Sequence, residues 1–380
     1  MPISTPTHLH VVAFDLPYPP DYGGAIDVYY KLKALHRLGV SVVLHAFLYG
    51  KKRQTDTPLA EFCTQIYTYP RLSAMQSRIG QYPYIVGSRR SDDLWRNLCA
   101  DQCPILFEGL HTCAYLPQAR AAGRVAMVRM HNIEADYYAS LYRSSSWGLK
   151  KIYYGAEAML LHRYERVLSY ADVVWAISPA DTAYLQQYYS TRYLPAFHAY
   201  DAPVSQLGKG NYALYHANLG VRENEIAALF LLREVFSLGS SLPLRLVIAG
   251  KNPTIALQKA IAQCPNALLL PNPDADYMRQ LIADAQVQLL PTFQATGIKL
   301  KLLESLFNGR FCLANTPMVA QTGLEDLCIV ADTASDFVAA LHRIADMPFT
   351  EAHRDHRRQV LSRLFDNAQG AAQLWQTACG

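Results

Sequence analysis

The sequence predicts an α/β protein built from two Rossmann-like halves, each with a parallel sheet covered by helices. Short apolar runs alternate with amphipathic helical segments along the chain. A stretch rich in proline and glycine, residues 191–210, separates a first series of these units from a second. A length of 380 residues also suits two domains better than one core. We therefore expect domains at 1–195 and 196–359, followed by a C-terminal helix at 360–380.

The composition is that of a globular protein. Hydrophobic residues make up 51% of the chain, and the formal net charge of +4 is too small to indicate a dedicated nucleic-acid-binding protein. The eight cysteines include no C-x-x-C pair, and Cys99 and Cys103 lack a histidine couple nearby in the sequence, so we expect reduced thiols and no metal site. Neither a signal peptide nor a run of eighteen apolar residues is found, which favours a cytoplasmic location.

The first half opens with a strand, helix and strand. An apolar run at 10–14 precedes an amphipathic helix that ends at Gly39, and a second apolar run follows at 40–47. The G-x-G-x-x-G fingerprint is absent, which disfavours a nicotinamide cofactor. Gly23 and Gly24 instead open the helix, where a ligand could approach the backbone closely. A tight turn explains two glycines equally well.

Polar side chains follow two later strands of the first half. An apolar run leads directly to Glu108, and the run at 125–130 leads to His131, Asn132 and Glu134. Because open α/β sheets bind ligands at the carboxyl ends of their strands, these residues are candidates for a cleft site. A histidine with a purely structural role is the alternative for His131.

Residues 147–170 predict a long amphipathic helix that carries basic and aromatic side chains, including Lys150 and Tyr153. Such a helix could lie against an anionic membrane surface, although a packed helix with a solvated basic face is the more common case. A strand is expected at 171–177, and Ser178 has the position of a helix N-cap directly after it.

The second half repeats the pattern from residue 212 onward. Asn218 and Arg222 follow its first predicted strand, and Lys251 follows its second. Lysine and arginine at these loops could contact phosphate groups, whereas solvated side chains are the ordinary explanation. Further strands are expected at 267–270 and 328–330.

The segment 289–316 contains the strongest candidate site. A short strand ending at Pro291 leads through small residues into a helix, whose free N–H groups and dipole favour an anion such as a diphosphate. Lys299 lies in the first turn of that helix, and Lys301 and Glu304 share one face. A carboxylate there could accept hydrogen bonds from sugar hydroxyls. An exposed ion pair between Lys301 and Glu304 is the alternative.

This segment resembles the donor-binding segment of the GT-B glycosyltransferases, particularly the group 1, GT4-like family. In that family a proline-ended strand leads into a glycine-containing loop and a helix with a glutamate that binds the ribose, which Glu304 matches. A second glutamate usually stands eight residues earlier and contacts the transferred sugar, but here that position is Thr296. Gly297, Lys299 and Lys301 resemble a G-x-K-x-K version of the loop found in some bacterial members.

Other segments match the same family in chain order. His131, in VRMHNIE, matches a histidine that contacts the donor sugar, and the loop with Gly23 and Gly24 resembles one that faces the interdomain cleft. Asn218 and Arg222 match a loop near the diphosphate. The resemblance implies the GT-B fold, in which two Rossmann-like domains face each other across a cleft, with the acceptor bound by the first domain and the nucleotide sugar by the second. It also implies that the last helix returns to the first domain.

The function that the resemblance implies is transfer of a sugar, of hexosyltransferase type, from a UDP- or GDP-linked nucleotide sugar to a glycan or lipid-linked acceptor. Retention of the anomeric configuration and a role in surface polysaccharide or glycolipid synthesis are expected with it, at the cytoplasmic side and with peripheral membrane contact. No D-x-D pair stands at a strand end, so neither a metal nor another cofactor is expected. The expected catalytic residues are His131, Lys299 and Lys301. The expected nucleotide-sugar-binding residues are Glu304, Gly297, Thr296, Ile298, Asn218, Arg222 and Lys251. The expected acceptor or cleft residues are Gly23, Gly24, Glu108, Asn132 and Glu134.

Three alternatives stay open. A non-catalytic GT-B-like protein that binds a nucleotide sugar or a partner enzyme is compatible with Thr296 in place of glutamate. A nucleotide-sugar 2-epimerase shares the architecture, but the sequence does not identify its acid and base. A periplasmic sugar-binding protein also has two similar lobes, and the missing signal peptide argues against it.

Overall fold

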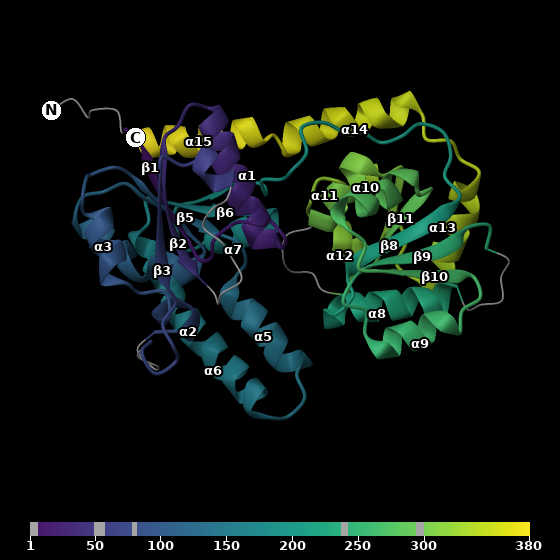
Figure 1. The fold of residues 1–380 in the computed structure, drawn as a ribbon, viewed down its shortest axis with the longest axis horizontal. Helices are drawn as coiled ribbons and strands as arrows, with labels where there is room; N and C mark the ends of the chain where they lie inside the picture. Colours follow the sequence, from purple (N-terminus) through teal and green to yellow (C-terminus); the bar gives the residue numbers. More distant parts are fainter. Residues whose placement is uncertain (1–6, 49–57, 78–81, 237–241, 294–299) are drawn as a thin grey trace. The chain divides into compact units, whose positions relative to one another are not determined.

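The structure is a computed structural model, which describes residues 7–48, 58–77, 82–236, 242–293 and 300–380. The chain folds into two compact units (Figure 1). Of the described residues, 7–199 and 365–380 belong to unit 1, and 200–293 and 300–364 belong to unit 2. Within the described parts, each unit contains one sheet whose strands are all parallel.

The sheet of unit 1 has the strand order β3-β2-β1-β4-β5-β6-β7. Its strands are β1 (Leu9–Ala13), β2 (Val42–Leu48), β3 (Gln65–Pro70), β4 (Ile105–Glu108), β5 (Ala126–Met130), β6 (Val173–Ala176) and β7 (Thr191–Tyr193). Strand β1 pairs with β2 on one side and with β4 on the other, so the strand order reverses between β1 and β4. Open parallel sheets bind ligands at such a switch point, outside the carboxyl ends of the strands.

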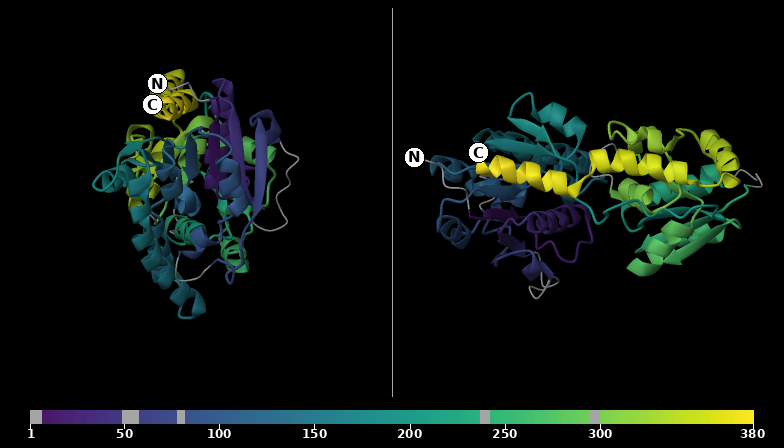
Figure 2. Two further views of the ribbon diagram at one scale, coloured as in Figure 1. Left: turned by 90° about the vertical axis from the view of Figure 1, so that its left-hand side faces the viewer. Right: turned by 90° about the horizontal axis from the view of Figure 1, so that it is seen from above.

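Helices cover both faces of this sheet. They are α1 (Gly23–Arg37), α2 (Tyr84–Gly87), α3 (Asp92–Leu98), α4 (Leu116–Ala121), α5 (Glu134–Ser144), α6 (Leu149–Tyr164), α7 (Pro179–Leu185) and α15 (Asn367–Cys379), with 3-10 turns η1 (Pro58–Glu61), η2 (Leu110–Tyr115) and η3 (Glu165–Tyr170). Neighbouring residues of β1 enter different cores, since Val11 packs with Leu32 of α1 and Leu374 of α15, whereas Val12 packs with Leu116 of α4. Helix α15 lies alongside α1 (Figure 2).

Two predicted boundaries in unit 1 differ from the structure. Residues 191–193, predicted as the start of a linker, form β7 beside β6. The N–H of Val174 in β6 donates to the carbonyl of Ser190, and the N–H of Leu194 donates to the carbonyl of Ala176 in β6. The predicted helix at 147–170 ends as α6 at Tyr164 and continues as the 3-10 turn η3. Helices α5 and α6 pack against each other as a hairpin that extends from the rest of unit 1 (Figure 1).

The sheet of unit 2 has the order β10-β9-β8-β11-β12-β13, so its switch point lies between β8 and β11. Its strands are β8 (Tyr212–Asn218), β9 (Arg245–Lys251), β10 (Ala267–Pro271), β11 (Val287–Leu290), β12 (Phe311–Ala314) and β13 (Ile329–Val330). The helical elements are α8 (Arg222–Phe230), η4 (Leu231–Val235), α9 (Ile255–Ala262), α10 (Ala275–Asp284), α11 (Leu300–Asn308), α12 (Thr316–Val319), η5 (Glu325–Leu327), α13 (Ala334–Ala345) and α14 (Glu351–Leu364).

Buried Arg357 of α14 fixes the end of α11. Its guanidinium donates hydrogen bonds to the carbonyls of Leu306 and Gly309, at 2.9 and 2.6 Å, and to that of Arg310. These carbonyls at or just beyond the helix end have no intrahelical partner, so the arginine supplies the donors that they need. The predicted C-terminal helix at 360–380 is interrupted between α14, which ends at Leu364, and α15, which begins at Asn367. Asp366 is the N-cap of α15, and its side chain accepts a hydrogen bond from the backbone N–H of Ala368.

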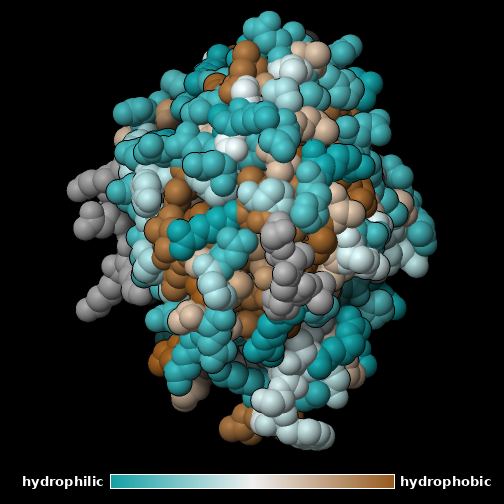
Figure 3. Space-filling model, turned by 90° about the vertical axis from the view of Figure 1, so that its right-hand side faces the viewer, coloured by the Kyte–Doolittle hydropathy of each residue, from teal (hydrophilic) through white to brown (hydrophobic). Residues whose placement is uncertain are grey.

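Figure 3 shows one face of the molecule, on which hydrophilic side chains form most of the outline and hydrophobic ones gather nearer the middle. Apolar atoms normally contribute a large share of a protein surface, so such areas alone indicate no function. Among the helices that the structure describes, none is both long enough and apolar enough to cross a membrane.

Candidate functional site

The carboxyl ends of β4 and β5 bring two predicted cleft residues together. Glu108 is the last residue of β4, and His131 follows β5 directly. Their side chains are buried, and the Nε2 of His131 lies 2.9 Å from the Oε2 of Glu108. This pair lies beside the switch point of the unit 1 sheet, where the topology favours a ligand site.

A buried charge network holds this pair in place. Lys31 donates from Nζ to Asp27 Oδ2 at 2.9 Å and to Glu108 Oε1 at 2.6 Å. Asp27 also accepts from Arg129 Nη2 at 3.0 Å and from the backbone N–H of Phe197 at 2.8 Å. The carboxylates of Asp27 and Glu108 therefore face the side chains of Lys31 and Arg129 in the interior. Burial alone would raise the pKa of Asp27, but Arg129 and Lys31 outweigh it and hold that pKa well below its usual range.

The residues of this network other than Glu108 and His131 were not predicted as site residues. Asp27 and Lys31 are one helical turn apart on the buried face of α1, where a charged pair interrupts an otherwise apolar stripe. Arg129 lies inside the completely buried strand β5. The sequence did offer a signal for this network, namely charged residues at positions where the apolar pattern predicts the core. Buried charges occur mainly where they are paired, so such residues indicate an internal ion pair.

Asp27, Glu108 and His131 lie close enough together to hold a metal ion. The Lys31 ammonium, however, already contacts both carboxylates. A metal at this position would have to displace that ammonium, which supplies the same kind of charge. The site geometry therefore favours a lysine over a metal as the cation of this cluster.

A second group lies after β5 at the start of α5. Asn132 hydrogen-bonds to the buried carboxyl of Glu134, and burial raises the pKa of Glu134 to about 7 in spite of that bond. The Nδ1 of His111 lies 3.9 Å from Glu134 Oε1, and burial lowers the pKa of His111 well below its usual value. A protonated carboxyl and a neutral imidazole are the forms favoured by this environment.

Phe14, directly after β1, packs against one histidine of each group. Its ring centroid lies 5.2 Å from that of His111 and 5.3 Å from that of His131. The Nδ1 atoms of both histidines are buried and make no hydrogen bond within the described part of the chain. Buried polar atoms without a partner are rare, and at the carboxyl edge of a sheet they mark places where a ligand can supply one.

One of the two predicted glycines of the first loop, Gly24, packs against an aromatic ring. A Cβ atom on Gly24 would lie 2.6 Å from Cζ of Phe14, so any other residue at this position would require the phenyl ring to shift. Gly23 is the first residue of α1. Glycine at position 24 is thus explained by the aromatic ring beside the histidines.

In unit 2, α11 places Lys301 and Glu304 beside β8. Lys301 Nζ donates to Asn224 Oδ1 at 3.3 Å and lies 5.0 Å from the ring centroid of Tyr215. Glu304 Oε2 lies 3.9 Å from Nδ1 of His216, the residue whose pKa burial lowers to about 3. Asn224 and His216 were not predicted as site residues.

The carboxyl of Glu304 is partly enclosed. Its side chain is 32% exposed. Burial raises the pKa of Glu304, while a hydrogen bond with Tyr200 and the charge of Lys301 oppose the rise. The carboxyl thus combines fixed neighbours with access to solvent, which is the arrangement needed to bind a polar ligand.

The other predicted residues of unit 2 are distributed around the same edge of the sheet. Asn218 ends β8 and accepts from the backbone N–H of Gly220 at 3.2 Å, and Lys251 ends the neighbouring β9 with its side chain exposed. Arg222 forms an ion pair of 2.8 Å with Glu225 within α8. Asn218 and Lys251 are neighbours across the two strands, whereas the charge of Arg222 is already paired.

The predicted anion-binding loop lies outside the described residues. It comprises Thr296, Gly297, Ile298 and Lys299. The described residues next to it are fixed, since Asn315 accepts from the backbone N–H of Thr292 at 3.0 Å and donates to its carbonyl at 2.7 Å. These two bonds join the segment after β11 to the end of β12.

Comparison with known proteins finds one curated relative and many solved structures of the same fold. No family model matches the sequence. A protein of Klebsiella pneumoniae, named "Uncharacterized 44.6 kDa protein in cps region", is 27% identical over 344 residues, which cover 85% of this chain and 87% of that protein.

Solved structures resemble the whole chain. Sucrose-phosphate synthase from Thermosynechococcus elongatus has a TM-score of 0.69 at 15% identity and covers 97% of this chain and 98% of its own. The α,α-trehalose-phosphate synthase (UDP-forming) from Burkholderia xenovorans, in complex with glucose-6-phosphate, has a TM-score of 0.62 at 12% identity, with 98% and 100% covered. Arabidopsis thaliana UGT89C1, in complex with UDP-L-rhamnose, has 0.56 at 11% identity, with 99% and 100% covered. The two parallel-sheet units and these neighbours confirm the predicted fold class: the chain has the GT-B fold.

Proposed function

We propose that the protein is a glycosyltransferase that moves a sugar from a nucleotide sugar to an acceptor hydroxyl, with retention and without a metal. The observation that carries the proposal is the position of Glu304. Its partly exposed carboxyl lies on α11, beside His216 of β8, at the switch point of the second sheet. A carboxylate there can accept hydrogen bonds from two ribose hydroxyls, while Tyr200 restricts its rotation.

The leaving diphosphate requires positive charge, which the chain can supply from side chains. Lys301 lies one turn before Glu304, and Lys251 ends the neighbouring strand β9. Lys299 of the undescribed loop is proposed for the same role. Cations placed where negative charge develops stabilise the transition state, so a metal ion is not needed in this mechanism.

His131 is proposed to contact the transferred sugar. Its Nε2 faces Glu108, whose other oxygen is held by Lys31. When Nε2–H donates to Glu108, Nδ1 is left as an acceptor for a sugar hydroxyl. The buried network thus fixes both the tautomer and the ring orientation, and His131 itself contacts substrate.

The names of the relatives support the choice of substrates. Among structures with the same fold, one neighbour is named as UDP-forming and another is bound to UDP-L-rhamnose. The Klebsiella pneumoniae relative is named for a cps region. We propose a UDP- or GDP-linked hexose donor and an acceptor that is a glycan or lipid-linked intermediate of capsular or other surface polysaccharide synthesis.

Peripheral membrane contact is proposed for the α5–α6 hairpin, as a lipid-linked acceptor would require. Trp147 and Leu149 are 85% and 86% exposed, and Ile152 is exposed on the next turn. Lys150 lies among them, and Lys151 is partly exposed beside them. Aromatic and aliphatic side chains next to lysines can enter the headgroup region of an anionic lipid surface.

A panel of nucleotides tests the donor site first. UDP, GDP, ADP, CMP and dTDP are added to the purified chain, and the unfolding temperature is measured. At a hundred times its dissociation constant a ligand stabilises a protein by about 2.7 kcal/mol, which is readily detected. We expect one nucleotide to stabilise clearly more than the others. A flat panel would favour a non-catalytic protein that binds a partner enzyme and no nucleotide.

Product analysis then separates the enzyme classes. With the matching nucleotide sugar and an acceptor, a transferase releases the nucleoside diphosphate and extends the acceptor. A 2-epimerase changes the sugar while it stays on its nucleotide, and a non-catalytic protein binds without turnover. Nucleotide binding without transfer to any glycan or lipid-linked acceptor would contradict the proposed activity.

A further inference from the structure

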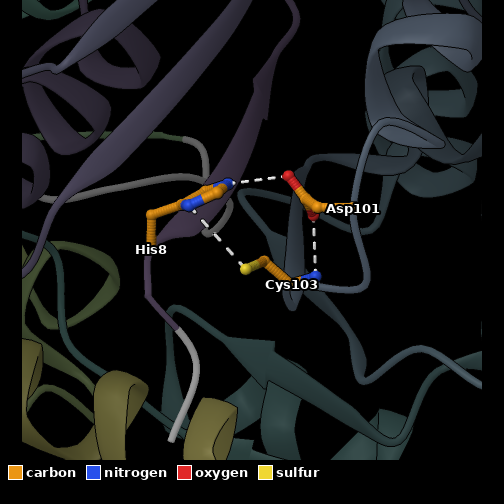
Figure 4. A group of neighbouring side chains, drawn as sticks. All are labelled: His8, Asp101 and Cys103. Atoms are coloured by element: carbon orange, nitrogen blue, oxygen red, sulfur yellow. Dashed lines mark hydrogen bonds and ion pairs between the residues drawn. The ribbon is translucent and has the colours of Figure 1, made fainter.

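A cluster of metal-ligating side chains lies at the amino ends of β1 and β4, away from the carboxyl-end site of unit 1. His8 directly precedes β1, and Asp101 and Cys103 come from the loop before β4 (Figure 4). His10 is the second residue of β1. His8 Nε2 and His10 Nε2 lie 3.0 and 3.1 Å from Asp101 Oδ2, and they lie 3.1 Å from each other. Three ligand atoms therefore form a nearly equilateral triangle.

We propose that this cluster binds one Zn²⁺ ion, with His8, His10, Asp101 and Cys103 as ligands. A tetrahedral zinc with metal–ligand distances of 2.0–2.1 Å has edges of about 3.3 Å between its nitrogen and oxygen ligands. The triangle has edges only slightly shorter than one face of that tetrahedron. A small outward movement of the side chains makes room for the ion.

Cys103 is placed to become the fourth ligand. Ligand atoms of His8, Asp101 and Cys103 lie within 4.8 Å of one another, and the Sγ of Cys103 lies 3.7 Å from His8 Nδ1. The backbone N–H of Cys103 donates to Asp101 Oδ1 at 2.7 Å, so the loop already wraps around the carboxylate. Because Sγ now lies beside the Nδ1 of His8, the cysteine side chain has to rotate toward the Nε2 of that ring to complete the shell. Coordination exchanges the S–H bond for an S–Zn bond and releases the thiol proton to water.

A second layer of hydrogen bonds orients His10. Its Nδ1 lies 2.9 Å from His45 Nε2, and the Nδ1 of His45 lies 2.8 Å from the hydroxyl of Tyr69. When Nε2 of His10 binds the metal, its Nδ1–H donates to His45, and His45 donates onward to Tyr69. Metal-ligating histidines usually have such a partner on the other ring nitrogen, which fixes the tautomer.

Arg124 contacts one carboxylate oxygen of Asp101, which leaves the other oxygen for the ion. Its Nη2 lies 3.4 Å from Asp101 Oδ1, and its guanidinium also donates to the carbonyl of Cys103. Oδ2 is the oxygen that faces both imidazoles. Asp101 and His8 are 30% and 21% exposed, so a hydrated ion can reach the cluster.

An activated thiol without metal is the competing explanation. Cys103, His8 and Asp101 form a chain in which one imidazole joins a thiol to a carboxylate. That arrangement gives no reason for His10 to converge on the same carboxylate oxygen with its own oriented ring. Metal coordination accounts for all four side chains, and the remote edge of the sheet suits a structural ion that ties the start of β1 to the loop before β4.

The test uses the full chain, first treated with a chelator under reducing conditions. Zn²⁺ binding is measured by calorimetry, and Co²⁺ is added as a spectroscopic probe. We expect one equivalent of Zn²⁺ and, with Co²⁺, a thiolate charge-transfer band together with the intense visible bands of tetrahedral cobalt. His8→Gln should weaken binding at least tenfold, and Cys103→Ser should abolish the charge-transfer band. Both positions are partly exposed, so the variants should fold.

Matched controls come from the same region and the same residue types. Cys99→Ser changes an exposed cysteine four residues from Cys103, and His36→Gln changes an exposed histidine of α1, so neither should alter binding. Zn²⁺ should also protect Cys103 from alkylation by iodoacetamide, read by mass spectrometry. Less than one equivalent of bound Zn²⁺, equal binding in His8→Gln, or a charge-transfer band retained by Cys103→Ser would overturn the proposal. Rapid alkylation of Cys103 that Zn²⁺ does not slow would instead support the activated thiol.

Discussion

The ammonium of Lys31 lies 2.6 Å from the carboxylate of Glu108, and both side chains are completely buried. Lys31 bridges Glu108 and Asp27, while Glu108 in turn holds His131. Removing one partner of a buried ionic network leaves an uncompensated charge without water. The stability of unit 1 and the orientation of His131 therefore both depend on Lys31.

Lys31→Met is expected to destabilise the protein by about 3–5 kcal/mol, because it leaves two buried carboxylates facing the remaining cation alone. Urea unfolding followed by circular dichroism measures the change. Lys33→Met, two residues along α1 and only partly buried, is the matched control and should change stability by less than about 1 kcal/mol. Equal effects of the two substitutions would contradict the structural role assigned to Lys31.

His131→Ala is expected to leave nucleotide affinity unchanged and to remove turnover, since we place the imidazole on the sugar and not on the nucleotide. Calorimetry with the preferred nucleotide and a transfer assay measure the two properties separately. His36→Ala, at an exposed position of α1, should leave both unchanged. Turnover near the wild-type rate in His131→Ala would exclude this histidine from the reaction.

Glu304→Gln is expected to weaken nucleotide binding about tenfold to a hundredfold, corresponding to a loss of about 1.5–3 kcal/mol for hydrogen bonds to a charged group. Titration calorimetry gives the affinity directly. Glu351→Gln removes an exposed carboxylate of α14 and serves as the control. An unchanged affinity in Glu304→Gln would remove α11 from the donor site.

Glu134 should make stability depend on pH. Burial raises its pKa to about 7, so between the ordinary carboxyl pKa of 4.5 and pH 7 the folded state binds more protons than the unfolded state. Its stabilising contribution is complete below that window and is lost as the pH rises through it. Relative to Glu134→Gln, the wild type should therefore lose about 2–3 kcal/mol of unfolding free energy when the pH is raised from 4.5 to 8. Urea unfolding at both pH values measures it, and a constant difference would show that this carboxyl has an ordinary pKa.

Leu149→Ser combined with Trp147→Ser should reduce binding to vesicles that contain anionic lipid, because both side chains are exposed on the α5–α6 hairpin beside lysines. Flotation with vesicles of phosphatidylglycerol and phosphatidylcholine measures the bound fraction. Met75→Ser removes an equally exposed apolar side chain elsewhere in unit 1 and should have no effect. If the wild type and the Trp147→Ser, Leu149→Ser variant bind the vesicles equally, the hairpin is not the contact surface.

The fold was predictable because its signals are local. Apolar runs, helical stripes and terminal glycines such as Gly39 specify the alternation of strands and helices without reference to distant residues. The short strand β7 was not predicted because three residues are too few to show a hydrophobic periodicity, and its assignment depends on pairing with β6. Likewise, the break before α15 depends on the cap formed by Asp366, which interrupts a continuous helical pattern.

The site was predictable where topology brings residues together. Glu108 and His131 follow adjacent parallel strands, so their meeting required only the rule that carboxyl ends share an edge. His8 and Cys103 lie 95 positions apart and meet only in the folded sheet. A search along the sequence for a histidine next to Cys103 therefore could not find this pair.

The pairing of α1 with α15 has a consequence for how the protein is made. On the ribosome, residues 200–364 of unit 2 are synthesised before α15, so unit 2 can fold on the nascent chain while unit 1 still lacks a helix of its core. His198 must likewise wait for Asn367, to whose side-chain amide its carbonyl binds at 2.8 Å. Unit 1, whose strands are synthesised before unit 2, is thus completed after it, and its partly exposed core is what a chaperone would meet during translation.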